Sequence, residues 1–217
     1  MHNRQSIRLK NYDYSQSGLY FITICTQNRE NIFGNIVGAD PRVRPISNPC
    51  VRPILKPVRP TSNAHIDTIR MTLNKYGNIV EKWLNKIPHK FHVVMDKCQI
   101  MPNHIHMIIN IISDDGLIQN LYSGQTQGSA PTSTPPTTIG TIIQWFKTMV
   151  TNEYIQNVHN KNWKPFEGRL FQRNYYEHII RSDNDLCKTR EYIMNNPALW
   201  YRDRNNPEKT NNNILLQ

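Results

Sequence analysis

The sequence predicts an α+β fold built on an antiparallel sheet, and three observations support this prediction. Short runs rich in β-branched and aromatic residues, with apolar side chains at every second position, indicate strands. Longer segments with apolar side chains three and four positions apart indicate helices. These segments follow one another as strand, helix, strand, strand, helix and strand, and one more helix follows the last strand.

The first half of the chain contains three of the expected strands and one long helix. The strands are the β-branched runs Leu19–Thr26, Phe91–Met95 (or its extension to Ile100) and His104–Ile112. Apolar residues at helical spacing predict the first helix from His65 to Lys86, and Pro88 is expected to end it. Pro102 and Asn103 predict the hairpin turn before the third strand.

The second half contains two helices and the last strand. Ile139 begins a helix whose apolar face extends to Tyr154, and Tyr175–Ile180 is the expected strand. Ser182, with Asp185 three residues later, predicts the N-cap of a helix over Asp183–Asn195.

This order of elements is that of a ferredoxin-like fold, an antiparallel sheet with both strand-connecting helices on one face. The opposite face is left open, where a substrate could lie. We expect one domain over residues 1–203, with low-complexity loop insertions at about 38–64 and 113–138. Residues 204–217 are expected to form a flexible tail.

The charge of the chain indicates a polyanionic partner. Lys and Arg number 26 against 16 Asp and Glu, which gives a net charge of +10 and a pI near 9.6. Nucleic acid is the usual partner of such a protein. No apolar run approaches the roughly 20 residues that span a bilayer, and the polar N-terminus is no secretory signal, so we expect a cytoplasmic protein without membrane contact. The scattered cysteines argue against a zinc knuckle.

The run Lys97–Ile112, KCQIMPNHIHMIINII, carries the first candidate site. Because side chains alternate along a strand, His104 and His106 share one face. The other face carries an apolar row suited to a core: Ile105, Met107, Ile109 and Ile111. Two imidazoles one strand repeat apart can hold a cation between them, although two histidines on a sheet surface would give the same pattern.

Tyr192 and Asn196 form the second candidate group, since residues four apart share one face of a helix. Tyr192 offers a nucleophilic hydroxyl, and the Asn196 amide oxygen suits a hard cation. With His104 and His106 they give a mixed nitrogen and oxygen site that fits Mg²⁺ or Mn²⁺ better than zinc, because it lacks a thiolate. Such a metal would polarise a phosphodiester for attack by Tyr192. Taken singly, Tyr192 also fits a packed aromatic and Asn196 a helix-terminal residue.

Three sequence segments, MPNHIHMII, FQRNYYEHIIRS and REYIMNNP, resemble the REP-associated tyrosine transposases and the related HUH transposases of insertion sequences. The resemblance covers roughly residues 18–200, interrupted by the two insertions. His104 and His106 match the two histidines that flank a hydrophobic residue in this superfamily. Tyr192 and Asn196 match the tyrosine and the asparagine of its helical segment.

The resemblance implies a DNA transposase or nuclease that cuts and joins single-stranded DNA at hairpins. Tyr192 would form a 5′-phosphotyrosine and release a 3′-hydroxyl, with Mg²⁺ or Mn²⁺ held by His104, His106 and Asn196. No nucleotide cofactor is expected, because the covalent link keeps the energy of the ester. The alternative is a non-catalytic or domesticated protein that binds hairpin DNA. A histidine-triad hydrolase would need a histidine where Ile108 stands, and a replication initiator or relaxase fits the short chain less well.

Further residues are candidates for DNA contact by charge and position. Arg173 and Arg181 are expected to bind phosphates, and Trp163 and Phe171 to stack on bases. Related insertion-sequence enzymes are dimers, whereas the REP-associated group is described as monomeric, so the resemblance favours a monomer.

Overall fold

The computed structural model describes residues 13, 16–38, 69–112 and 137–207. Its strands are β1 (Gly18–Cys25), β2 (Gly34–Val37), β3 (Arg70–Leu73), β4 (Val93–Ile100), β5 (His104–Ile111) and β6 (Tyr176–Ile180). Its helices are α1 (Lys75–Lys90), α2 (Ile139–Lys161) and α3 (Asp183–Asn195), with 3-10 turns η1 (Gln27–Arg29) and η3 (Trp200–Arg202). The predicted α+β fold is confirmed.

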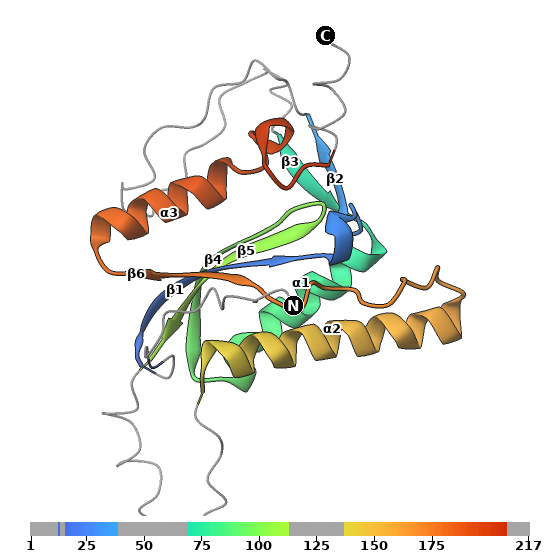
Figure 1. Cartoon of the computed structure of the whole chain (residues 1–217), viewed down its shortest axis with the longest axis horizontal. Helices are drawn as coiled ribbons and strands as arrows, with labels where there is room; N and C mark the ends of the chain where they lie inside the picture. The colour runs from blue at the N-terminus through green and yellow to red at the C-terminus, as the bar shows by residue number, and fades with distance from the viewer. Residues whose placement is uncertain (1–12, 14–15, 39–68, 113–136, 208–217) are drawn as a thin grey trace, which may run out of the picture.

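The main sheet has the order β4-β5-β1-β6, and all its neighbours are antiparallel. This is the ferredoxin-like strand order, with β2 and β3 added as a separate two-stranded sheet. As Figure 1 shows, α1 and α2 lie on one face of the main sheet, as expected, and α3 lies across the other. The third helix therefore occupies part of the face that the sequence analysis left open.

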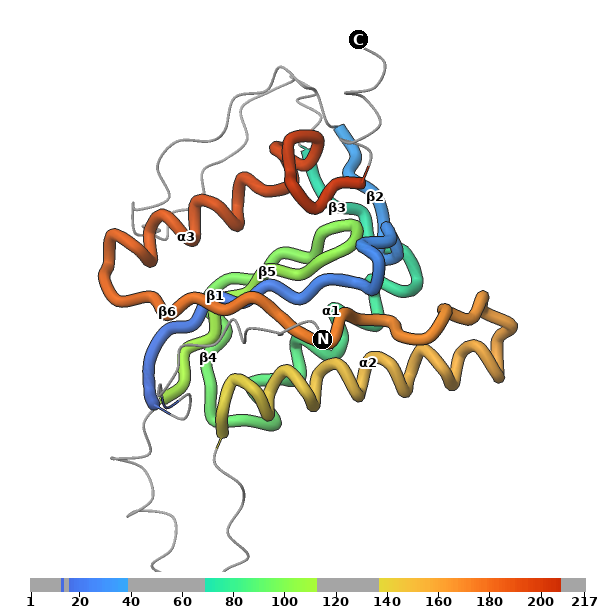
Figure 2. Tube along the Cα trace, in the orientation of Figure 1, coloured from blue at the N-terminus to red at the C-terminus, as the bar shows by residue number. Residues whose placement is uncertain are grey.

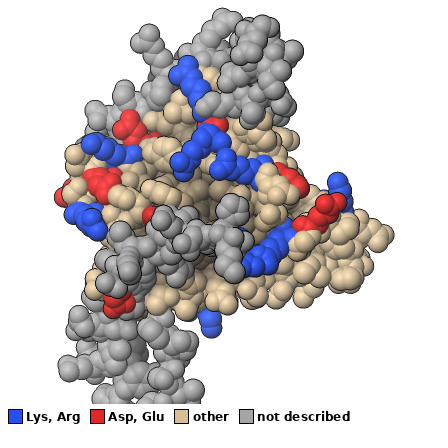
Figure 3. All heavy atoms as spheres, in the orientation of Figure 1, with Lys and Arg blue, Asp and Glu red and all other residues tan. Residues whose placement is uncertain are grey.

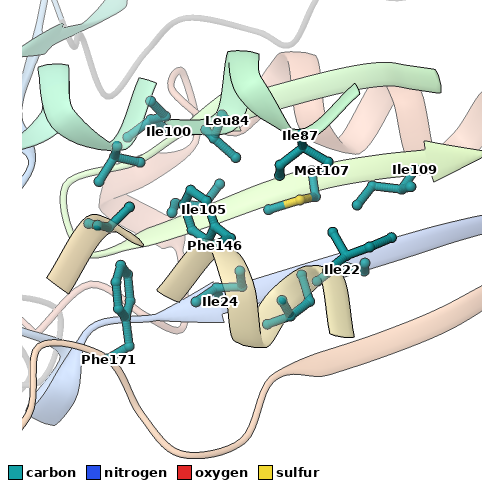
Figure 4. Packing of buried hydrophobic residues seen from close by; sticks show 14 of the residues in the cluster. Ile22, Ile24, Leu84, Ile87, Ile100, Ile105, Met107, Ile109, Phe146 and Phe171 are labelled. Atoms are coloured by element: carbon teal, nitrogen blue, oxygen red, sulfur yellow. The ribbon is translucent and has the colours of Figure 1, made fainter. Parts of the chain in front are cut away.

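The alternation along β5 divides its side chains between two cores. Ile105, Met107 and Ile109 belong to the large core beneath α1 and α2 (Figure 4). Ile108 faces the opposite way and packs with Ile193 of α3 in a smaller core. The predicted faces of this strand are therefore confirmed, and the histidines of β5 lie on the α3 side.

The predicted first helix is wrong at its N-terminal end. Residues 70–73 form β3, which pairs with β2, and α1 begins only at Lys75. Asn74 caps the helix, because its side-chain oxygen accepts hydrogen bonds from the backbone N–H groups of Tyr76 and Gly77. The prediction that Pro88 ends the helix is also wrong, because α1 passes through Pro88 and ends at Lys90.

Most of the residues in the predicted insertions, 38–64 and 113–138, lie outside the described part of the chain. Thr138 is described and forms a capping box with Thr141 at the start of α2. The predicted tail begins too early, because Asn205 and Asn206 are buried. Residues 208–217 are outside the described residues. Among the helices that the structure describes, none has the length and apolar character needed to cross a bilayer.

Candidate metal and tyrosine site

The two histidines of β5 meet on the α3 side of the sheet. His104 and His106 are buried, and their Nε2 atoms lie 2.9 Å apart. The period of two along the strand brings the rings together, as the sequence predicts. Two nitrogen atoms at this separation, one of them without a proton, can share a proton or bind one cation.

The ring of His104 is oriented by its sequence neighbour. The Asn103 side-chain amide donates to the carbonyl oxygens of Arg29 (2.8 Å) and Asn205 (2.7 Å). Its own oxygen therefore faces His104 Nδ1 at 2.8 Å and accepts a hydrogen bond from the Nδ1–H group. A neutral His104 then presents an unprotonated Nε2 to the site.

His106 has a comparable partner on the central strand. Its Nδ1 lies 2.8 Å from the hydroxyl of Thr23, the residue opposite His106 in the β1–β5 pairing. A hydroxyl can donate or accept, so Thr23 allows Nε2 of His106 to be free for a cation.

Burial keeps both imidazoles neutral. It lowers the pKa of His104 to about 4, although the Asp203 carboxylate acts in the opposite direction. Burial also lowers the pKa of His106 well below its ordinary value, and the neighbouring His104 adds to this effect. Neutral imidazole is the form that binds metals.

Tyr192 of α3 stands above the histidines. Its hydroxyl oxygen is 3.3 Å from His106 Nε2, and its ring lies edge-on to Phe21 of β1. The side chain remains 43% exposed, so a substrate can reach the hydroxyl. Burial is the largest cause that raises the pKa of Tyr192, and Asp203 adds to it. The hydroxyl is therefore protonated at neutral pH.

An ion pair ties the helix of Tyr192 to the sheet. Arg190 donates from Nε to one oxygen of Asp96 at 2.8 Å and from Nη2 to the other. The ladder between β4 and β5 shifts register between Met95 and Lys97, so Asp96 lies at a bulge. Bulges commonly re-aim side chains beside active sites. Here the ion pair fixes α3, and with it Tyr192, relative to β4.

Asn196 lies one helical turn after Tyr192, at the C-cap of α3. Its amide is close to both His104 and Tyr192, but its buried oxygen has no hydrogen-bond partner. A buried carbonyl oxygen without a donor is costly and requires an explanation. A cation beside the histidine pair would provide one, so the residues present fit a metal.

Asp203 is a site residue that the sequence analysis missed. Its buried carboxylate places Oδ2 3.9 Å from His104 Nε2, and Oδ1 accepts a hydrogen bond from the backbone of Asn205. One ligand atom from each of His104, His106 and Asp203 lies within 4.8 Å of the others, so this group could hold a metal. Asp203 stands at the predicted end of the domain. The sequence signal for ordered structure there is the turn propensity of Asn205 and Asn206.

A cleft of about 640 Å³ opens beside this group. Its lining residues are Phe21, Thr23, Tyr176, Tyr192, Asn196, Leu199, Arg202, Asp203 and Arg204. The trace in Figure 2 shows that the chain turns back after α3, and Asp203 and Arg204, which line the cleft, follow this turn. Lys and Arg side chains gather across the middle of the face seen in Figure 3.

The predicted DNA-contacting residues differ in their exposure. Arg173 and Arg181 are exposed, and their contact with phosphates stays a prediction. The ring of Trp163 packs against Tyr76 with centroids 4.7 Å apart. Phe171 is only 5% exposed and belongs to the large core, so its assignment as a base-stacking residue is wrong.

Glu177 and His178 are neighbours on β6. His178 Nε2 lies 2.9 Å from Asp185 Oδ2 at the start of α3. It thereby connects β6 to that helix. Both carboxylate oxygens of Glu177 are buried without a hydrogen-bond partner. Glu177 is paired with Ile22, whose side chain is in the large core, so it lies on the face away from Tyr192.

No protein-family model matches the chain. An uncharacterized protein of Haemophilus influenzae is 37% identical over 205 residues, which cover 94% of this chain and 93% of the relative. The chain belongs to the same family as this protein. A second Haemophilus influenzae protein, named "Putative REP-associated tyrosine transposase", is 28% identical over 102 residues, 46% of each chain. The predicted resemblance to the REP-associated tyrosine transposases is confirmed.

Two solved structures are also similar to the chain. A REP-associated tyrosine transposase bound to a REP hairpin has a TM-score of 0.43 and 14% identity, over 88% of this chain and 72% of the other. A putative transposase from Deinococcus radiodurans has a TM-score of 0.41 and 11% identity, over 87% of this chain and 95% of the other.

Proposed function

We propose that the protein is a metal-dependent transposase that cuts and joins single-stranded DNA at hairpin sequences. The observation that carries this proposal is the position of the Tyr192 hydroxyl, 3.3 Å from the histidine pair and exposed to a cleft. A nucleophile, neutral nitrogen ligands and an unpartnered amide oxygen meet at one point. A protein that only bound DNA would not need this combination.

The metal would be held by His104, His106 and Asn196, with the carboxylate of Asp203 beside them. Imidazole, amide and carboxylate donors without a thiolate favour Mg²⁺ or Mn²⁺. When bound, such an ion supplies Lewis-acid polarisation of a phosphoryl oxygen. The protein residues hold the ligand atoms in place: Asn103 orients His104, and Thr23 orients His106.

Tyr192 carries the covalent step. Its hydroxyl oxygen forms a bond to the phosphorus of a phosphodiester while the bond from phosphorus to the 3′ oxygen breaks. The phenol proton leaves to water in the open cleft, and the departing oxygen takes a proton to become a 3′-hydroxyl. The product is a 5′-phosphotyrosine. Attack on it by another 3′-hydroxyl restores a phosphodiester, so joining needs no nucleotide cofactor.

The test uses labelled single-stranded hairpin DNA from the flanks of the gene, incubated with protein and Mg²⁺ or Mn²⁺. On a denaturing gel we expect a metal-dependent covalent adduct that is lost in Tyr192→Phe and strongly reduced in His104→Ala. Tyr76→Phe, in an aromatic cluster between α1 and α2, is the matched control and should form the adduct. Hairpin binding without an adduct under either metal would instead support the non-catalytic DNA-binding alternative.

A further inference from the structure

Arg204 stands at the edge of the cleft that contains Tyr192 and Asn196. Its backbone is held in place, because Arg29 donates from Nη1 to the Arg204 carbonyl at 3.0 Å. The next carbonyl, of Asn205, accepts from Asn103 at 2.7 Å. The exposed Arg204 side chain therefore extends from a backbone that is tied to the histidine strand.

The charge of Arg204 reaches every reactive group of the site. It contributes to lowering the pKa of His104 and of His106, and it opposes the rise in the pKa of Tyr192. Arg204 also lines the same cleft as Tyr192, Asn196 and Asp203, so its side chain stands beside the position where a reacting group would be bound.

This position is electrostatically unfavourable without an anion. A guanidinium repels a divalent cation held by the histidines, and Asp203 offsets only part of the positive charge. Within the described part of the chain, the Arg204 guanidinium has no hydrogen-bond or ion-pair partner. The five N–H donors of this guanidinium therefore have no acceptor among the described residues.

We propose that Arg204 binds the non-bridging oxygens of the phosphodiester that Tyr192 attacks. The planar guanidinium matches a phosphate group with two parallel hydrogen bonds. The bound anion would lie between the guanidinium and the metal ligands and would be attracted by both. This inference rests on the proposed function and names the residue that places the reacting phosphate.

Neighbouring arginines are less suited to this role. The guanidinium of Arg202 lies 5.1 Å over the ring of Tyr201, and Arg202 has a further interaction. The guanidinium of Arg29 is used to hold the Arg204 carbonyl. Arg204 alone combines exposure to the cleft with a free guanidinium within the described residues.

The experiment compares two hairpin substrates, whose cleavage position is first mapped with the wild-type protein. One has an ordinary phosphodiester at that position, and the other has a methylphosphonate, in which a methyl group replaces one charged oxygen. Single-turnover rates of adduct formation are measured for the wild type and Arg204→Ala at saturating DNA. Arg70→Ala, an exposed arginine on β3, is the matched control. Arg204→Lys tests whether a positive charge without the planar guanidinium is enough to maintain the rate of adduct formation.

On the phosphodiester we expect Arg204→Ala to lower the rate about 100-fold, the order of effect for loss of one donor to a reacting oxyanion. On the methylphosphonate the wild type and Arg204→Ala should differ by less than about threefold, because the charge that Arg204 recognises is absent. Arg204→Lys should recover part of the phosphodiester rate, and Arg70→Ala should match the wild type.

Three results would overturn the inference. One is an Arg204→Ala rate on the phosphodiester equal to that of the wild type. Another is an equal loss on both substrates, which would show that Arg204 only supports the structure. If the wild-type protein forms no adduct with any hairpin, the proposed function fails and this inference fails with it.

Discussion

The Asn103 side chain makes three hydrogen bonds, which join His104 to Arg29 of η1 and to Asn205 in the segment after α3. Its amide nitrogen donates to two backbone carbonyls, and its oxygen accepts a hydrogen bond from Nδ1–H of His104. Partners of this kind orient metal-binding histidines and raise the basicity of the ligand nitrogen. One buried amide therefore sets the tautomer of His104 and fixes the turn that carries Asp203.

We predict that Asn103→Ala weakens Mn²⁺ binding about 10- to 100-fold, as expected for loss of such a partner. It should also lower the free energy of unfolding by about 1–3 kcal/mol, because two buried carbonyls and one N–H lose their partner. Titration by electron paramagnetic resonance gives the first quantity and urea unfolding the second. Asn85→Ala, at an exposed position of α1, should change neither. An unchanged Mn²⁺ affinity in Asn103→Ala would contradict the role of Asn103.

The residues that the sequence could predict are those placed by simple periodicity. Strand alternation brings His104 and His106 together, and one helical turn separates Tyr192 from Asn196. Asp203 and Arg204 reach the site because the chain turns back after α3, and no repeating pattern encodes that turn. Phe171 was misassigned because an aromatic residue among basic ones looks the same whether it is buried or exposed.

At the level of elements, the N-terminal end of α1 illustrates how packing limits a helix. The spacing of apolar residues from His65 onward suggested a helix, but residues 70–73, which include the apolar Met71 and Leu73, form β3 against β2. β2 and β3 have four residues each, which is too short to show the two-residue alternation that identifies a strand in a sequence. In contrast, α3 covers the predicted range Asp183–Asn195, because its N-cap Ser182 and the partner Asp185 are local in sequence.

Gly77 in the first turn of α1 permits this packing. A Cβ atom at this position would clash with the backbone carbonyl oxygen of Phe33 and approach Leu73. We predict that Gly77→Ala lowers the free energy of unfolding by about 1–3 kcal/mol through overpacking, although alanine favours helices. Urea unfolding measures this change. Asn78→Ala, exposed on the same helix, should be neutral or slightly stabilising. A stabilised Gly77→Ala would show that β2 can move away from α1.

On the scale of the whole molecule, the sheet is covered on both faces, and the two sides have different roles. The side of α1 and α2 contains the large core and stabilises the fold. On the other side a smaller core, formed by Phe21, Ile108, Ile180 and Ile193, supports α3 beside the cleft. The histidines thus stand on the sheet and Tyr192 on α3, and the cleft that Tyr192 and Asn196 line also contacts Asp203 and Arg204 of the segment after η3.

The complete site lies within one chain. The Tyr192 hydroxyl is 3.3 Å from His106 of the same chain, and Arg190 binds Asp96 of the same sheet. We therefore predict that one chain supplies both the nucleophile and the metal ligands. A mixture of Tyr192→Phe and His104→Ala proteins should form no more adduct with hairpin DNA than the two variants form separately. The measurement is the amount of adduct on a denaturing gel after the two proteins are mixed and equilibrated. Adduct formation restored by mixing would mean that Tyr192 of one chain acts at the histidines of another.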